Sequence, residues 1–120
     1  MAITPGYEEF LCDVLSGLGP VTIRKMFGGA GIYLDGVMFG LIADDTLYLK
    51  TDAESAHAFE AESKGPFIYQ PKDRRPVSMS YWEVPERLYD DPDDLVLWAR
   101  RAHDIACIAR PKANKARRKA

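Results

Sequence analysis

Apolar residues recur along the chain with two different spacings, and these spacings predict where helices and strands lie. Residues 7–18 are apolar at intervals of three and four, as in an amphipathic helix. Residues 21–51 form short apolar runs separated by turn residues, which is typical of an antiparallel β-meander. Helical spacing returns at residues 53–63 and 95–109. The sequence therefore predicts an α+β fold, in which an antiparallel β-meander sheet packs with N-terminal, middle and C-terminal helices.

Turn residues divide the meander into strands, which we expect at 21–26, 30–34, 37–43 and 46–50. Asp35 and Gly36 lie between apolar runs and predict a type I′ hairpin, whose two central residues both need positive φ. The glycine-rich residues 28–31 and the two aspartates at 44–45 predict the other turns. Further strands are expected at 67–69 and 77–84. Strand 37–43 is apolar throughout, which predicts burial on both faces, or one face against helices and the other against a partner.

Residues that favour helix ends support the three predicted helices. Thr4 before Pro5 predicts an N-cap followed by a first-turn proline. Asp52 is the expected cap of helix 53–63. Pro92, within a run of aspartates, predicts the start of the last helix, where acids interact favourably with the helix dipole.

The cysteines and histidines have ordinary structural interpretations. Cys12 and Cys107 lie among apolar residues of predicted helices, so we expect both to be buried as small hydrophobic residues rather than joined in a disulfide. His57 and His103 fall toward the polar sides of their helices, where we expect contact with solvent. Because there is no CxxC pair and the histidines stand alone, the sequence predicts no metal site and no cofactor.

Length and composition indicate one domain at residues 1–109, followed by a basic, disordered tail at 110–120. The 120 residues are 47% hydrophobic, which is enough for a core. No apolar run approaches the ~20 residues that a membrane span needs. The N-terminus has no basic region followed by an apolar one, so we expect a cytoplasmic protein without a secretory signal.

Charge is distributed unevenly between these two parts. The tail carries six basic side chains and no acid, whereas residues 1–109 hold ten basic and eighteen acidic ones, a net charge of −8. An acidic body is not typical of a domain that binds DNA through its folded face. The tail can contact nucleic acid non-specifically, or it can keep the chain soluble. Its basic residues are Arg110, Lys112, Lys115, Arg117, Arg118 and Lys119.

No combination of residues suggests catalysis, and we expect a protein that is not an enzyme. The acids lie in turns and at a helix start, with no His or Ser partner in the sequence around them. Residues 28–31 can in principle hold a phosphate through backbone N–H groups. However, the Lys-Ser or Lys-Thr of a P-loop is missing, and Leu34 stands where the dinucleotide motif has its third glycine. A tight turn is the favoured interpretation, and ligand contact is the alternative.

A cluster of basic and aromatic residues supports a second function. Lys72, Arg74 and Arg75 lie near Tyr69 on one side and Tyr81 and Trp82 on the other. Such clusters bind nucleic acid through phosphate contacts and base stacking. A solvated loop beside a core strand is the simpler interpretation. Direct nucleic-acid binding through this loop and the basic tail is therefore the alternative function.

The apolar strand at 37–43, together with Met26 and Phe27, predicts a surface for another protein. A small domain seldom leaves such a sheet face in water. We expect a homodimer that forms through a sheet face or an edge strand. Met26 and Phe27 are expected to be part of this surface.

Residues 24–52, RKMFGGAGIYLDGVMFGLIADDTLYLKTD, resemble the N-terminal domain of the TfoX/Sxy competence regulators. The resemblance lies in the Met-Phe-Gly-Gly turn, the Leu-Asp-Gly-Val-Met-Phe hairpin and the Leu-Tyr-Leu-Lys strand. It continues through Phe59, the pair at 66–67, residues 79–85 and the last helix. In total it covers about residues 7–108, which is nearly the whole predicted domain.

This resemblance implies a regulatory role and no catalytic motif. It also implies that recurring positions of the family are structural or interfacial, among them Met26, Phe27, Gly28, Gly29, Tyr81 and Trp82. Full-length members of the family regulate transcription of DNA-uptake genes, in some cases alongside the cyclic-AMP receptor protein, and have a second, C-terminal domain. The implied function is that of a non-enzymatic protein-interaction domain in transcriptional regulation. The implied partners are a second copy of the chain and a transcription factor or RNA polymerase component, with nucleic acid reached through the tail and no membrane.

Overall fold

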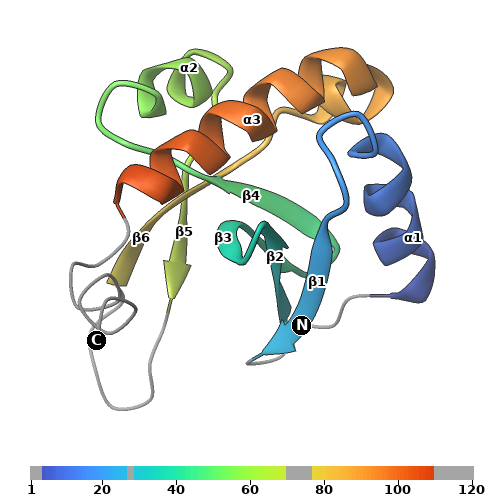
Figure 1. The fold of residues 1–120 in the computed structure, drawn as a ribbon. Helices are drawn as coiled ribbons and strands as arrows, with labels where there is room; N and C mark the ends of the chain where they lie inside the picture. The colour runs from blue at the N-terminus through green and yellow to red at the C-terminus, as the bar shows by residue number, and fades with distance from the viewer. Residues whose placement is uncertain (1–3, 27–28, 70–76, 110–120) are drawn as a thin grey trace, which may run out of the picture.

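The computed structural model describes residues 4–26, 29–69 and 77–109, which form a six-stranded antiparallel sheet with helices packed against it (Figure 1). The predicted α+β fold is confirmed. α3 lies across the sheet between α1 and α2. The elements are α1 (Pro5–Val14), β1 (Thr22–Met26), β2 (Gly29–Leu34), β3 (Val37–Ala43), β4 (Thr46–Lys50), α2 (Ala56–Ala61), β5 (Pro66–Tyr69), β6 (Val77–Glu83), the 3-10 helix η1 (Glu86–Asp90) and α3 (Pro92–Ile108).

The strand order is β1-β2-β3-β4-β6-β5, so the predicted meander forms the first four strands. β6 adds to the free side of β4, and β5 forms the far edge beside β6. Every neighbouring pair is antiparallel. None of the helices in the described ranges has the length and apolar character needed to cross a membrane.

Two turns of the meander adopt the left-handed conformation at both central residues. Asp35 and Gly36 have φ of 54° and 78°, which confirms the predicted type I′ hairpin. Asp44 and Asp45 have φ of 52° and 53° without any glycine. Aspartate tolerates this conformation better than most residues because its short polar side chain makes local hydrogen bonds. The Asp45 carboxylate also accepts hydrogen bonds from the backbone N–H (2.9 Å) and hydroxyl (3.2 Å) of Thr4, the N-cap of α1.

The glycine-rich segment forms a strand where the sequence predicts a four-residue turn at 28–31. Met26 pairs with Gly29, and β2 runs from Gly29 onward. Residues 27–28 lie outside the described ranges. A Cβ atom on Gly29 would collide with the carbonyl oxygen of Ile42 in β3. Glycine is therefore needed at position 29 for close approach of two strands.

A β-bulge in β3 directs Phe39 into the core. Ile32 pairs with Gly40 and Tyr33 with Met38, so Phe39 is the extra residue. Phe39 is completely buried, and its ring meets the His103 ring of α3 edge to face with centroids 5.9 Å apart. The His103 Nε2 atom lies 2.9 Å from the carbonyl oxygen of Leu34.

The solvated position predicted for His103 is therefore wrong. Position 103 lies four residues after Ala99 and three before Ala106, both of which are buried, so it shares the side of α3 that meets the sheet. His57 does lie in solvent, as predicted: its side chain on α2 is 79% exposed.

α3 covers β3 and β4 through a stripe of small side chains, which allows close approach of helix and sheet. Trp98 and Ile105, which share the apolar spacing of residues 95–109, are only partly buried. The buried residues of α3 are Leu95, Ala99, Ala102 and Ala106.

Two other expectations need correction. Cys12 is exposed, because neighbouring Leu11 occupies the buried side of α1, and Cys107 is partly exposed. Both are free thiols. α2 begins at Ala56 rather than 53, since Asp52 and Ser55 form a turn before it: the Asp52 carboxylate accepts the Ser55 N–H at 2.7 Å, and the Ser55 hydroxyl accepts the Asp52 N–H at 3.0 Å.

Candidate interaction surface

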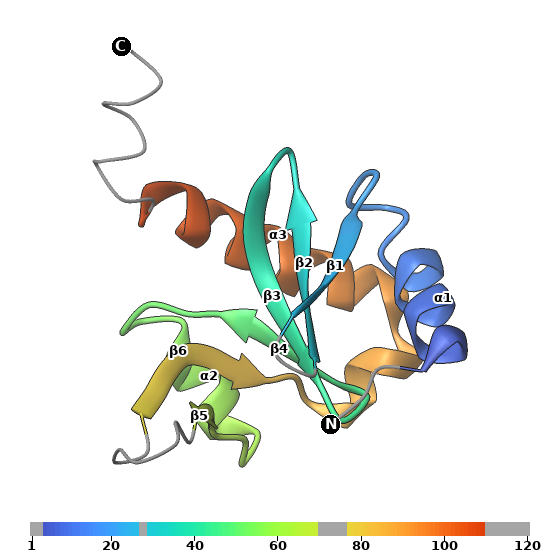
Figure 2. The ribbon, with the colours of Figure 1, turned by 90° about the horizontal axis from the view of Figure 1, so that it is seen from below.

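The face of the sheet opposite α3 has no described helix over it, and we call it the outer sheet face. Figure 2 views the molecule from this side, with α3 behind β1, β2 and β3. Strand residues alternate between faces, so those between buried core positions point outward. By the strand register the outer sheet face includes Thr22, Arg24, Tyr33, Met38, Leu41, Tyr48, Lys50, Phe67, Tyr81 and Glu83.

Burial along the strands supports this assignment. In β4, Leu47 and Leu49 are completely buried, and Tyr48 between them is only partly buried. The strand register then extends the surface: Tyr48 pairs with Leu41 of β3. Alternation of a buried and a half-buried apolar side gives a sheet that is apolar on both faces.

The outer sheet face is rich in aromatic rings, each with a close neighbour. Tyr48 and Phe67 meet edge to face with ring centroids 5.1 Å apart. The Arg24 guanidinium lies 5.7 Å from the centre of the Tyr33 ring. Aromatic pairs and cations over ring faces each contribute about 0.5–1 kcal/mol beyond burial. These contacts hold the rings in fixed positions, which reduces the entropy lost when a partner binds them.

Burial affects the chemistry of the tyrosines on this face. It raises the pKa of Tyr81, and the nearby Tyr33 hydroxyl adds to the effect. Burial also raises the pKa of Tyr48, with the Glu83 carboxylate contributing. Tyr48 and Tyr81 therefore act as neutral hydrogen-bonding groups near neutral pH.

The structure separates Tyr81 and Trp82, which the sequence analysis grouped as interaction residues. Tyr81 lies on the outer sheet face, where the Lys50 ammonium is 5.2 Å from its ring centre. Trp82 lies on the helix side, packed against the core, with its ring 6.4 Å from that of Phe59. Gly29 opens β2, as described above. Met26 ends β1, and its side chain, like the whole of Phe27 and Gly28, is outside the described structure.

The residues predicted to contact nucleic acid also lie outside the described ranges. They are Lys72, Arg74, Arg75, Arg110, Lys112, Lys115, Arg117, Arg118 and Lys119. Conversely, the sequence analysis did not single out Tyr33, Tyr48 or Phe67. A signal for Tyr48 was present, because strand 46–50 alternates strictly between Leu and other residues.

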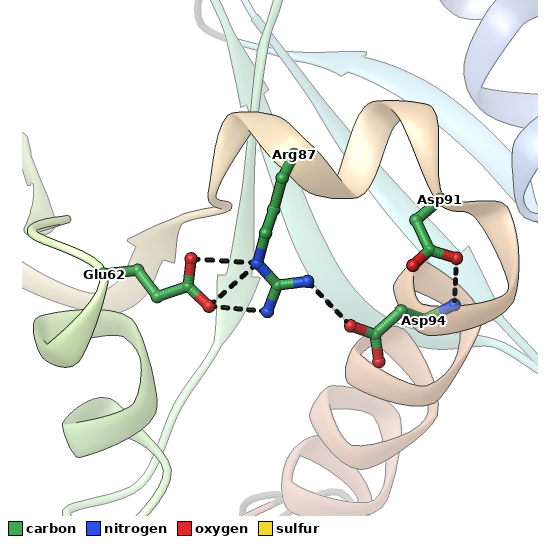
Figure 3. A network of polar contacts seen from close by, with 4 residues as sticks. All are labelled: Glu62, Arg87, Asp91 and Asp94. Carbon is green, nitrogen blue, oxygen red and sulfur yellow. Dashed lines mark hydrogen bonds and ion pairs between the residues drawn. The ribbon is translucent and has the colours of Figure 1, made fainter.

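The acidic residues near the start of α3 have structural partners (Figure 3). Arg87 of η1 donates to Glu62 through Nε (3.0 Å) and Nη2 (2.6 Å), and through Nη1 to Asp94 (2.9 Å). Asp91 caps α3 by accepting the Asp94 N–H at 3.3 Å. Hydrogen bonding to Arg87 lowers the pKa of Glu62. Within the described ranges, no group of three or more His, Cys, Asp or Glu residues is arranged to hold a metal ion.

Sequence comparisons agree with the resemblance seen in the meander. Protein Sxy of Escherichia coli is 27% identical to the chain over 94 residues, which are 78% of this chain and 44% of Sxy. The DNA transformation protein TfoX1 of Aliivibrio fischeri is 27% identical over 103 residues, 86% of this chain and 49% of TfoX1. The chain thus spans about half the length of these relatives. The profile of the TfoX N-terminal domain matches residues 13–106, from the last residues of α1 almost to the end of α3. The chain belongs to the TfoX N-terminal domain family.

Proposed function

We propose that this chain is a non-enzymatic, cytoplasmic regulatory domain that binds a protein partner through the outer sheet face. The observation that carries the proposal is the half-buried apolar and aromatic surface on the sheet, opposite the helices. Monomeric proteins rarely expose large contiguous apolar patches, and those that do use them for interaction. The relative named DNA transformation protein TfoX1 supports a role in DNA transformation. That this role is exerted on transcription is part of the proposal.

The composition of this surface suits a protein partner. Protein interfaces are enriched in tyrosine, phenylalanine, methionine and arginine, and each of these occurs on the outer sheet face. A second copy of the chain is the first partner we propose. A two-fold dimer would bring identical surfaces together, so that one patch covers its own copy. A transcription factor or RNA polymerase component is the second proposed partner.

Analytical ultracentrifugation of outer-face variants tests this proposal. We expect the wild type to be a dimer across a concentration series, and Leu41→Lys on β3 to be a monomer with a folded circular-dichroism spectrum. Arg24→Glu, at an exposed position of the same face, should weaken the dimer less than Leu41→Lys does. Ile108→Glu is the matched control, because Ile108 is 82% exposed at the end of α3. If the wild type sediments as a monomer at every concentration, the proposed homodimer is excluded.

An affinity pull-down with nuclease then separates the dimer from the regulatory role. If the wild type retains a transcription factor or polymerase subunit after nuclease and Leu41→Lys does not, the outer sheet face serves a heterologous partner. If the wild type is a monomer and retains no partner either, the interaction role is excluded.

Direct nucleic-acid binding is the second candidate function, favoured by the segregation of charge along the sequence. Six basic side chains and no acid occupy residues 110–120. Binding through them would weaken steeply with salt, because neutralised phosphates release counterions. Deletion of residues 110–120 should then reduce the slope of log affinity against log salt. Equal slopes for both proteins would exclude a contribution from the tail.

A further inference from the structure

A cavity of about 270 Å³ lies between α2 and α3, and Lys50 at the end of β4 also lines it. Its walls are mainly apolar, with two aromatic rings at their centre. Phe59 and Trp98 meet edge to face with ring centroids 4.9 Å apart. The lining residues are Lys50, Ser55, Ala58, Phe59, Asp94, Leu97, Trp98, Arg101, Ala102 and Ile105.

The cavity exists because small side chains line part of it. Ala58 of α2 and Ala102 of α3 contribute single methyl groups. Leu97, another lining residue, is 63% exposed, so a large apolar side chain faces solvent at the border of an apolar space. A ligand with an apolar body would bury this leucine together with the exposed part of Trp98, and burial of apolar area favours binding.

The polar groups of the cavity favour an anion. Arg101 forms no ion pair with any residue of the described ranges. A hydrogen bond from the Ser55 N–H lowers the pKa of Asp52, and the charge of Arg101 adds to this effect. Ser55 is only 3% exposed, and its hydroxyl is 3.5 Å from the Asp52 carbonyl oxygen, which is long for a hydrogen bond. Both side chains can donate hydrogen bonds.

The other charged groups that line the cavity are already engaged. The Asp94 carboxylate accepts from Arg87 at 2.9 Å. The Lys50 ammonium lies over the Tyr81 ring, which belongs to the outer sheet face. The cavity therefore offers a cation and a hydroxyl to a ligand, while its one lining carboxylate shares the charge of Arg87 with Glu62.

We propose that this cavity binds a small organic anion, namely a carboxylate attached to an aryl or branched apolar body. The apolar body would contact Phe59, Leu97 and Trp98, and the carboxylate would accept hydrogen bonds from Arg101 and Ser55. The volume lies at the lower end of the range for ligand pockets, which suits a free metabolite-sized acid. This site goes beyond the interaction role of the outer sheet face and gives the domain a means of responding to a small molecule.

The test is a titration of the full chain with 4-phenylbutyrate, followed by ¹H–¹⁵N NMR. We expect saturable shifts at the Trp98 indole N–H and at backbone amides of α2 and α3. The neutral analogue 4-phenylbutyramide should bind about tenfold more weakly, because it lacks the charge that Arg101 recognises. Equal binding of acid and amide would overturn the proposal, as would no saturable shift at about 10 mM acid.

Three variants localise the site. Arg101→Gln should weaken binding of the acid about tenfold, and the neighbouring Arg100→Gln should leave it unchanged. Ala58→Leu should fill the cavity and abolish binding; position 58 is exposed, so the substitution does not crowd the core. Undiminished binding by Ala58→Leu contradicts the site. If that variant is unfolded, the difference between Arg101→Gln and Arg100→Gln decides, and equal affinities overturn the proposal.

Discussion

The β1–β4 meander and the region around α2 are held in place by different forces. In the meander, Ile32, Ile42, Leu47 and Leu49 are completely buried under α3. α2, in contrast, buries only Phe59 among its own residues. Its C-terminal end is joined to η1 and α3 by the exposed pairs that Arg87 makes with Glu62 and Asp94. The meander is thus stabilised mainly by apolar burial, and α2 is attached through one ring cluster and a polar bridge.

This difference indicates where the molecule can change its structure. Segments with few buried apolar contacts open locally at lower free energy than the core. The cavity between α2 and α3 lies at the weakly attached side, whereas most residues of the outer sheet face belong to the meander, with Phe67 of β5 and Tyr81 of β6 beside them. We therefore expect a partner on the sheet to meet a fixed surface, and a ligand in the cavity to meet a wall that can adjust.

The largest predicted effect comes from truncation of the meander core. Leu49→Ala should reduce the free energy of unfolding by about 2–5 kcal/mol, because it removes buried apolar area and leaves a cavity. Leu97→Ala is the matched control: the same change at a side chain that is 63% exposed should have little effect. Chemical denaturation monitored by circular dichroism measures both. If both variants lose a similar free energy of unfolding, apolar burial is not what distinguishes the meander core from the exposed side of α3.

A smaller loss is expected from an added methyl group at the start of β2. Gly29→Ala places a Cβ against the Ile42 carbonyl oxygen, and the strands must separate to accommodate it. Overpacking of this kind costs about 1–3 kcal/mol. Gly6→Ala on α1, where no atom lies within 4 Å of the added Cβ, should leave stability unchanged or raise it. A neutral Gly29→Ala would remove the steric requirement and leave the glycine-rich segment open to the ligand-binding interpretation.

The sequence predicted the meander better than the α2 region, for a physical reason. Hairpins are local: Asp35-Gly36 and Asp44-Asp45 set their own backbone conformation, and strand alternation assigns each side chain to a face. η1, the Arg87 bridge and the cavity depend on residues far apart in the chain. Glu62 and Arg87, for example, are 25 positions apart, and no local pattern pairs them. His103 was misplaced because a polar ring in the sequence gives no sign that a β-bulge places Phe39 beside it.

Loss of the Arg87 bridge should affect α2 alone. Arg87→Met keeps an unbranched apolar stem near Trp98 but removes the bonds to Glu62 and Asp94. We expect faster hydrogen exchange in α2 and unchanged exchange in β2–β4, with a smaller effect on global stability than either substitution above. Added salt should reduce the difference in α2 exchange rate between Arg87→Met and the wild type, because salt screens the exposed charges of the bridge. Arg100→Met is the control, because among the described residues the Arg100 guanidinium has a hydrogen bond to the Gly17 carbonyl oxygen alone, at 3.5 Å. Faster exchange throughout the sheet would show that the bridge supports the whole fold.

The smallest predicted effect is a pH dependence of the protection of α2 from hydrogen exchange. The hydrogen bond from Arg87 lowers the pKa of Glu62 in the folded protein. A carboxyl group with a lowered folded pKa binds protons more readily in the unfolded state, so its contribution to stability is complete above the ordinary glutamate pKa and is lost as pH falls through the lower folded value. Protection factors in α2 should therefore fall in acid for the wild type and approach those of Glu62→Gln, which lacks the charge at every pH. Glu86→Gln is the control, because Glu86 is 86% exposed and meets Lys64 only at 3.9 Å. If Glu62→Gln shows the same acid dependence as the wild type, another group controls the attachment of α2, and the Arg87 bridge is not what distinguishes this region from the meander.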